Sequence, residues 1–452
     1  MNGLLPFAMF GTLVVLLFTG YPVGLVLGGV GLLYGVIGIA TGDFLAIQFY
    51  NIVPRMFGGA GENLLLVAVP MFVFMGVVLE KTGAANELLR VLQLLLRRAP
   101  GGLALSVVLL GTVLAAMTGI IGASVVMITL LALPTLLAQG YAGPLATGTI
   151  AASGTLGILL PPSIMLVIMA DLMGASVGSL FLAAIAPGLM LAALYSIYIV
   201  AHAMLRPGDA PPPAPSATRD AGNLALLILK SFVPPVALIS LVLGSIFFGW
   251  ATVTEASGIG AAGALVLGLW MRRLDWATLI DALDQSLRTI GMIFLVILGA
   301  TTFSFVFRAL GGDEVVQHLI EEVGAGRWAI IASFMLAIFV LGFFFDWTEI
   351  VLIVLPVILP AFALLDFSDH VGGRRDVTVW FAMLVAINLQ TSFLTPPFGF
   401  ALFYLKGTAP PDLSVGTIYR GIIPFVLLQL LALAIIIVFP EVALWLPNAV
   451  LR

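Results

Sequence analysis

The fold of this chain is decided by a glycine- and proline-rich stretch at residues 151–162, which reads AASGTLGILLPP. The stretch interrupts an apolar segment that runs from residue 143 to residue 173. Proline removes a backbone donor and clashes with the preceding helical turn, and glycine loosens a helix. The segment must therefore break as a helix, with carbonyl groups freed around residues 153–160. Such carbonyls persist at membrane depth only where they are buried in protein or line a wet cavity.

Composition makes lipid the solvent for most of the chain. Of 452 residues, 62% are hydrophobic and only 9% are charged, whereas soluble domains carry about a quarter charged residues. The net charge of −4 leaves no basic face for nucleic acid. The absence of cysteine excludes disulfides, iron–sulfur clusters and thiolate metal sites. Residues 1–20 lack a basic n-region, so we interpret them as a retained span and not as a signal peptide.

The two halves of the chain resemble each other, which predicts an internal duplication. Leu159-Leu160-Pro161-Pro162 is matched by Leu394-Thr395-Pro396-Pro397. Two further matches occur in the same order, one upstream and one downstream. The matched segments are 124–134 with 346–356, 159–162 with 394–397, and 176–179 with 414–417.

We predict an all-α polytopic membrane protein of two inverted-topology repeats. The first repeat covers residues 1–205, a proline-rich linker covers 206–223, and the second repeat covers 224–452. Segments 101–138 and 328–365 are predicted to be re-entrant hairpins. Each half then has five full spans, about ten in all, and an odd number of spans inverts the second half. The rival interpretation is twelve or more plain spans without hairpins.

Charge distribution predicts the orientation. Residues 80–98 carry four basic and two acidic residues, whereas residues 308–327 carry two basic and four acidic residues. The positive-inside rule places the first loop in the cytoplasm and the second outside, which puts Arg55 and Arg308 on the outer side. We therefore predict a multi-pass protein of the bacterial inner membrane with its N-terminus outside. The amphipathic pieces Asp43–Phe57 and Ala84–Arg98 are typical of helices at the membrane interface.

The first candidate site joins the broken segment to the tip of the first hairpin. Hydroxyls and freed carbonyls there suit a hard cation, and Ser124 is expected to be the N-cap of the helix that follows the tip. The residues we assign to this site are Gly119, Gly122, Ser124, Ser153, Gly154, Thr155 and Gly157, with Pro161 and Pro162 as the break.

The second candidate site repeats the arrangement in the second half. A single proline break is more often a simple kink, but two matched breaks with polar clusters favour discontinuous helices. Asp346 is as well explained as a helix N-cap as it is as an ion ligand, and both roles can hold together. The ion-site residues are Phe344, Asp346, Gln390, Thr391, Ser392 and Thr395; the helix-break and substrate-cavity residues are Thr348, Glu349, Asn388, Pro396 and Pro397.

We predict two Na⁺ sites, one in each half of the chain. Na⁺ needs several oxygen ligands, and the first break offers carbonyls and hydroxyls but no carboxylate or histidine that could carry a proton. No nucleotide-binding or hydrolase motif occurs in the sequence, so we predict a carrier that is not an enzyme, with no cofactor and no metal besides Na⁺. Asp171 is expected to end a helix and Glu255 to cap the next span. Since no basic residue lies securely in a membrane segment near either break, anion recognition is expected to use helix ends, amides and hydroxyls.

Three motifs together resemble the large membrane subunit of tripartite ATP-independent periplasmic (TRAP) transporters, over nearly the whole chain. They are Gly154-Thr155-Leu156-Gly157-Ile158-Leu159-Leu160-Pro161-Pro162-Ser163, Thr252-Val253-Thr254-Glu255-Ala256, and Asn388-Leu389-Gln390-Thr391-Ser392-Phe393-Leu394-Thr395-Pro396-Pro397-Phe398-Gly399. The first hairpin tip departs from the family pattern, because Ala123-Ser124 stands where Gly-Ser is common.

The resemblance implies Na⁺-driven, elevator-type uptake of a small organic anion, usually a carboxylate. It also implies two partners, a small four-helix membrane subunit and a soluble periplasmic substrate-binding protein. The alternative is a stand-alone Na⁺/dicarboxylate symporter, which has the same architecture but needs no binding protein. The sequence does not name the anion.

Overall fold

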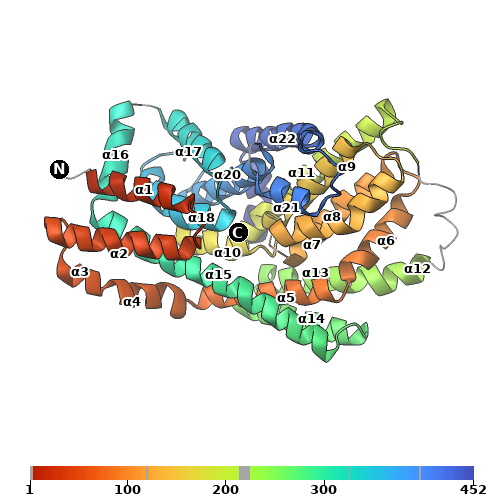
Figure 1. Ribbon diagram of the computed structural model, residues 1–452, viewed down its shortest axis with the longest axis horizontal. Helices are drawn as coiled ribbons and strands as arrows, with labels where there is room; N and C mark the ends of the chain where they lie inside the picture. The colour runs from red at the N-terminus through yellow and green to blue at the C-terminus, as the bar shows by residue number, and fades with distance from the viewer. Residues whose placement is uncertain (1–3, 119–120, 213–223, 325, 397–398, 452) are drawn as a thin grey trace.

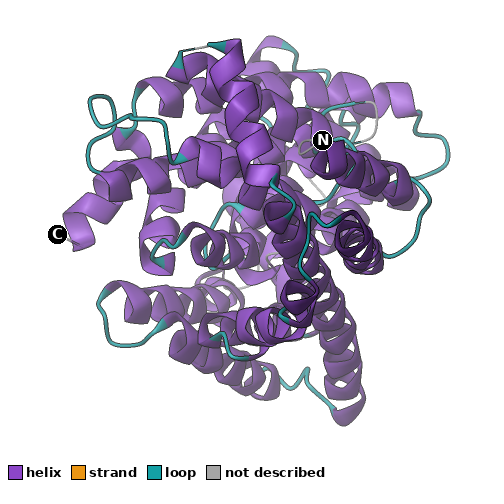
Figure 2. Cartoon of the chain, turned by 90° about the vertical axis from the view of Figure 1, so that its left-hand side faces the viewer, coloured by secondary structure: helices purple, strands orange, loops and turns teal. Residues whose placement is uncertain are grey.

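The computed structural model of the chain describes residues 4–118, 121–212, 224–324, 326–396 and 399–451. These residues form helices joined by loops, with no strand among them (Figure 2). Within the described ranges, nine helical segments are long and apolar enough to cross a membrane, and six shorter apolar helices accompany them. The protein is therefore an all-α polytopic membrane protein, as the sequence predicts.

One set of helices lies along the lower edge of Figure 1 and includes four long helices that we call the framework helices: α2, α5, α14 and α15. The set is α1 (Leu4–Leu17), α2 (Val23–Thr41), α3 (Ala46–Tyr50), α4 (Ile52–Met56), α5 (Ala68–Lys81), α12 (Leu224–Leu227), α13 (Val233–Phe247), α14 (Val253–Trp270) and α15 (Trp276–Ala309), of which α1 and α2 lie somewhat higher in the view.

Most of the remaining helices form a second set, which we call the central group. Its members are α7 (Gly102–Thr118), α8 (Ile121–Ala138), α9 (Gly143–Thr155), α10 (Ile164–Met173), α11 (Val177–Leu205), α17 (Arg327–Leu341), α18 (Trp347–Glu349), α19 (Leu355–Phe362), α20 (Arg374–Leu394), α21 (Phe400–Thr408), α22 (Val415–Val438) and α23 (Glu441–Leu451). Helix α20 is the most enclosed of the candidate spans, with 94% of its apolar window buried. The core of the molecule therefore lies around α20, away from lipid.

Two amphipathic helices connect the two sets. Helix α6 (Ala84–Leu96) leads from α5 to α7, and helix α16 (Gly312–Val323) leads from α15 to α17. The amphipathic pieces expected at 43–57 and 84–98 are thus helical, as α3 with α4 and as α6.

Glycines let framework helices from opposite halves of the chain pack closely. On α2, Gly24 faces Leu295 and Gly31 faces Thr302 of α15, so the two helices run parallel. A Cβ atom on Gly24 would stand 2.6 Å from the backbone carbonyl of Leu295. Small residues at a helix interface allow this close backbone approach, which dispersion forces then stabilise.

Helices α5 and α14 form a second parallel pair across the halves. Gly260 faces Met75, and two turns later Gly268 faces Thr82. The N-terminus of α14 carries a complete capping box, because Thr252 accepts from the Glu255 N–H while Glu255 accepts from the Thr252 N–H. The prediction that Glu255 caps this span is confirmed.

The structure corrects or extends some of the predictions about individual helices. Ser124 lies inside α8, which already begins by Ile121, so the prediction that it is an N-cap is wrong. Helix α23 was not predicted; it packs against α11 and α20. Of the predicted linker 206–223, residues 213–223 lie outside the described ranges. Asp171 does lie near the end of its helix, α10, which closes with the left-handed Gly174.

Replacing Gly24 by alanine should destabilise the protein, because the added methyl meets the Leu295 backbone. Overpacking of this kind costs about 1–3 kcal/mol. Gly29→Ala is the matched control, since it lies on the same helix with nothing within 4 Å of the new Cβ. Thermal unfolding in lipid nanodiscs measures both variants, and equal melting temperatures for them would contradict the close α2–α15 contact.

Candidate functional site

The first break lies between α9 and α10, where the sequence places it. Helix α9 ends at Thr155, a 3₁₀ turn follows at Leu156–Ile158, and α10 begins at Ile164. Ser163 closes the gap: its hydroxyl donates to the Ile158 carbonyl (2.5 Å) and accepts from the Leu166 N–H (3.4 Å). Pro161 has no N–H to offer to the Gly157 carbonyl, which a continuous helix would pair with it.

The first hairpin packs directly on this break. A Cβ on Gly111 of α7 would lie 2.6 Å from both Cβ and O of Ser153, and a Cβ on Gly154 would collide with Val125 of α8. The hydroxyls of Ser153 and Thr155 donate to the carbonyls of Thr149 (2.6 Å) and Ala152 (2.9 Å). Both residues are fully buried, so their oxygen lone pairs face protein and not solvent.

The second break separates α20 from α21 and gathers carbonyl groups. The Thr395 hydroxyl donates to the Thr391 carbonyl at 2.7 Å. Gly399 has φ +23°, and at the place where its Cβ would stand, the carbonyl oxygens of Phe393 and Thr395 lie 2.7 and 3.1 Å away. Two carbonyl oxygens therefore converge on one point beside the break.

The second hairpin packs against α20 just before this break. The Asn388 side chain donates to the Met335 carbonyl of α17 at 2.6 Å, and a Cβ on Gly342 would meet Ser392, whose own Cβ lies 2.6 Å away. The hydroxyls of Thr391 and Ser392 donate to carbonyls of their own helix. Asp346 occupies the N-cap position of α18, although its side chain makes no hydrogen bond to the N2 or N3 backbone.

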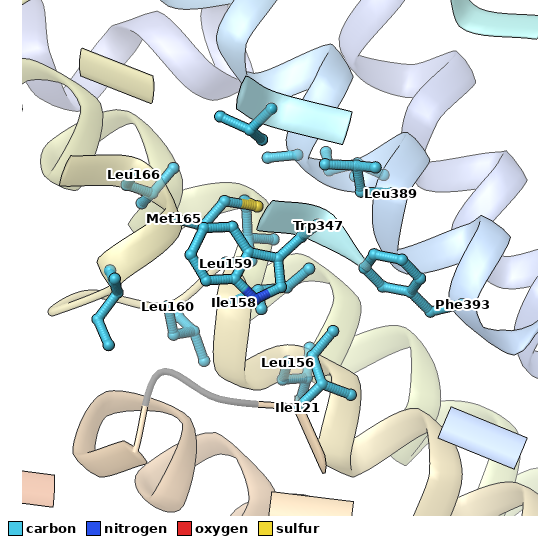
Figure 3. Packing of buried hydrophobic residues seen from close by; sticks show 14 of the residues in the cluster. Ile121, Leu156, Ile158, Leu159, Leu160, Met165, Leu166, Trp347, Leu389 and Phe393 are labelled. Atoms are coloured by element: carbon cyan, nitrogen blue, oxygen red, sulfur yellow. The ribbon is translucent and has the colours of Figure 1, made fainter. Parts of the chain in front are cut away.

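Trp347 joins the second hairpin to the first break. It is 2% exposed, and Figure 3 shows its indole beside Ile158 and Leu159 on one side, with Phe393 of α20 on the other. A side chain from the second half thus packs on the break of the first. The two candidate sites belong to one buried cluster.

Tyr404 of α21 packs against the first hairpin. A Cβ on Gly122 of α8 would stand 2.8 Å from the Tyr404 ring. A side chain from the second half thus lies directly against the start of α8.

Two of the predicted site residues have buried side-chain atoms that make no hydrogen bond with any described residue. These atoms are the oxygen and the nitrogen of the Gln390 amide and Oε2 of Glu349. Leaving a buried polar group unpaired costs about 1–3 kcal/mol, so such groups point to a ligand, an ion or water. The predicted Gly119 and Pro397 lie outside the described ranges.

Two cavities lie between framework helices and the central group. One, of about 490 Å³, is bordered by Glu80 and Gln285 on the framework side and by Gly122 and Tyr404 on the central side. The other, of about 240 Å³, lies at the opposite end of α15 and reaches Pro356 of the second hairpin.

Residues 10–442 match the model of a protein family described as tripartite ATP-independent periplasmic transporter, DctM component. The chain belongs to this family.

Curated relatives of this TRAP permease align along most of their length. The ectoine TRAP transporter large permease protein TeaC of Halomonas elongata is 28% identical over 98% of this chain and 99% of its own. The sialic acid TRAP transporter large permease protein SiaM of Vibrio cholerae is 27% identical over 96% of both chains. The C4-dicarboxylate TRAP transporter large permease protein DctM of Pseudomonas aeruginosa is 26% identical over 86% of this chain and 87% of its own.

A solved structure confirms the fold. The YdaH transporter of Alcanivorax borkumensis covers 90% of both chains with a TM-score of 0.62 at 15% identity. The relatives are transport proteins, so the prediction that the chain is not an enzyme is confirmed.

Trp347 and Tyr404 were not predicted as site residues of the permease. Trp347 follows the predicted Asp346 directly, and an aromatic residue at a hairpin tip is a signal for packing across the tip. Tyr404 carries no such signal, because its role depends on which tip α21 meets.

Alanine at Gly342 should lower the stability of the permease by about 1–3 kcal/mol, because the new methyl meets the Ser392 side chain. Adding Ser392→Gly removes the opposing atoms and should recover part of the loss. Thermal unfolding of the wild type, the two single variants and the double variant gives a double-mutant cycle, from which the interaction energy between the two positions is obtained. Purely additive losses would show that hairpin 2 does not pack on Ser392.

Proposed function

We propose that this permease couples Na⁺ entry to the uptake of a small organic anion across the bacterial inner membrane. The observation that carries the proposal is the pair of matched helix breaks, each covered by the hairpin of its own half. Relatives named for C4-dicarboxylate, sialic acid and ectoine support an organic-acid ligand of the carboxylate type.

Family membership also supports the proposed partners. They are a small four-helix membrane subunit and a soluble periplasmic binding protein that delivers the anion. In the stand-alone symporter alternative, the chain would take its anion directly from solution.

The coupling ion is proposed to bind at each break. At the first, the ligands are carbonyls near Gly119–Ser124 and Ser153–Gly157, helped by the buried hydroxyls of Ser153 and Thr155. At the second, an oxygen-rich pocket near Asp346 is supported by the carbonyls that converge beside Gly399 and by the Thr391 and Ser392 hydroxyls. The Gln390 amide, which has no partner among the described residues, also supports it. Na⁺ replaces its hydration shell with such unwound-helix carbonyls.

Inverted repeats and an elevator movement are proposed for the architecture. We take α2 of the first half as the equivalent of α14 in the second, and α5 as the equivalent of α15. A two-fold axis in the membrane plane then turns the α2–α15 pair into the α14–α5 pair, and both pairs are parallel, as this symmetry requires. Helices α9 and α22 also run parallel across the halves, because Gly143 faces Thr417 and Gly148 faces Gly421. The cavities at both ends of α15 supply room for the central group to slide against the framework.

Reconstitution tests the dependence on a binding protein. Liposomes holding the permease and its small subunit should take up succinate, N-acetylneuraminate or ectoine only when a cognate ligand-loaded binding protein and an inward Na⁺ gradient are both present. Uptake without the binding protein would favour the stand-alone symporter instead.

Removing hydroxyls at a break should weaken the Na⁺ dependence of uptake. The double variants Ser153→Ala with Thr155→Ala, and Thr391→Ala with Ser392→Ala, each delete two oxygen ligands while the backbone is kept. We expect a several-fold higher Na⁺ concentration for half-maximal uptake, with unchanged binding-protein docking. Wild-type Na⁺ dependence in both double variants, or uptake driven by a pH gradient alone, would refute these sites.

A further inference from the structure

The smaller cavity contains a concentration of charge that the predicted sites do not use. It lies where α4 and α15 of the framework side face α10 and the second hairpin. The polar residues that border it are Arg55, Asp171, Thr301, Ser304 and Arg308.

Both arginines are held against the end of α15. The Arg55 guanidinium lies 4.8 Å from the centroid of the Phe305 ring, one turn before Arg308. The Arg308 Nη2 donates to the Pro356 carbonyl of the second hairpin at 3.2 Å, while its nearest carboxylate, Asp313, is 3.8 Å away. Each guanidinium keeps donors directed away from these contacts, because the group has five N–H bonds in a fork.

The third charge in the cavity is partly satisfied by a neighbour. Oδ1 of Asp171 accepts from the Asn63 amide at 2.8 Å. Among the residues that border the cavity, two guanidinium groups therefore stand beside one hydrogen-bonded carboxylate, while Asp313, the ion-pair partner of Arg308, lies outside that lining. Asp171 can also accept from a hydroxyl or ammonium group on a ligand.

The cavity at the other end of α15 has the opposite character. Glu80 stands four residues before α6 begins, and Arg308 stands four residues before α16 begins, so they occupy equivalent places in the two halves. Gln285, beside Glu80, is 23 residues from Arg308 on the same helix, about 35 Å along its axis. The two cavities, which lie toward opposite ends of α15, therefore contain side chains of opposite charge.

We propose that Arg55 and Arg308 form an anion site that receives the carboxylate or sulfonate group of the ligand in the cavity beside the second hairpin. The proposal rests on the proposed anion transport and adds the residues that select charge. A guanidinium fork matches an oxyanion in charge and geometry, and a cleft lined by one sign of charge concentrates ions of the other sign. Contact of Arg308 with Pro356 places this site beside the hairpin that covers the second break.

Charged thiol reagents test the site without any transport, because the chain has no cysteine of its own. Ser304→Cys places one thiol in the arginine cavity, and Gln285→Cys places one beside Glu80. Each variant of the full chain in nanodiscs is reacted with anionic sulfonatoethyl methanethiosulfonate and with cationic trimethylammonium-ethyl methanethiosulfonate. The ratio of anionic to cationic rates should be higher at Ser304→Cys than at Gln285→Cys by about tenfold.

Neutralising both arginines should remove this preference. Arg55→Gln with Arg308→Gln in the Ser304→Cys background should lower the ratio by about tenfold. Arg55→Lys with Arg308→Lys, which keeps the charge, should retain it. Arg288→Gln, exposed and paired with Asp284 outside the cavity, is the matched control and should change nothing.

A second experiment uses succinate as a competing anion. It should slow the modification of Ser304→Cys in the wild-type background and fail to do so in the double glutamine variant. An unchanged rate ratio in that variant, or equal ratios in the two cavities, would overturn the anion site and leave the Na⁺ proposal standing. Loss of Na⁺-coupled uptake with the ratios intact would overturn the proposed function and leave the anion site.

Discussion

The structure depends on one constraint: backbone groups freed by a broken helix must find partners inside the protein, because lipid offers none. Pro161 lies in the gap between α9 and α10, and Pro396 follows α20, the most enclosed of the candidate spans. The freed groups are covered by the two hairpins, by the Ser163 hydroxyl and by a turn at Gly399. A break that is covered in this way keeps its polar backbone groups away from lipid.

Close approach of backbones is the means by which this covering is achieved. Gly111 places α7 directly on Ser153, and Gly342 places the second hairpin directly on Ser392. A side chain at either glycine would lift its hairpin from the break. The same use of glycine joins α2 to α15 within the framework, and two cavities lie between the framework and the central group.

The sequence predicts the features that depend on residues close together in the chain. Proline and glycine reveal the breaks, and the Thr252–Glu255 spacing reveals a capping box. Ser124 was misplaced because a serine after a glycine-rich tip suits an N-cap, whereas apolar packing starts α8 by Ile121. Trp347, Tyr404 and the Arg55–Arg308 cavity depend on contacts between segments far apart in the chain, which periodicity and spacing do not encode.

Spin-label distances test the central claim, that the central group moves as one body against the framework. Labels on exposed leucines of the cysteine-free chain report three distances: Leu269 to Leu287 within the framework, Leu189 to Leu427 within the central group, and Leu287 to Leu427 between the two. On exchange of K⁺ for Na⁺ with succinate, the account predicts a shift of several ångströms in the Leu287–Leu427 distance alone. A constant distance between the sets, or a change within either one, would contradict it.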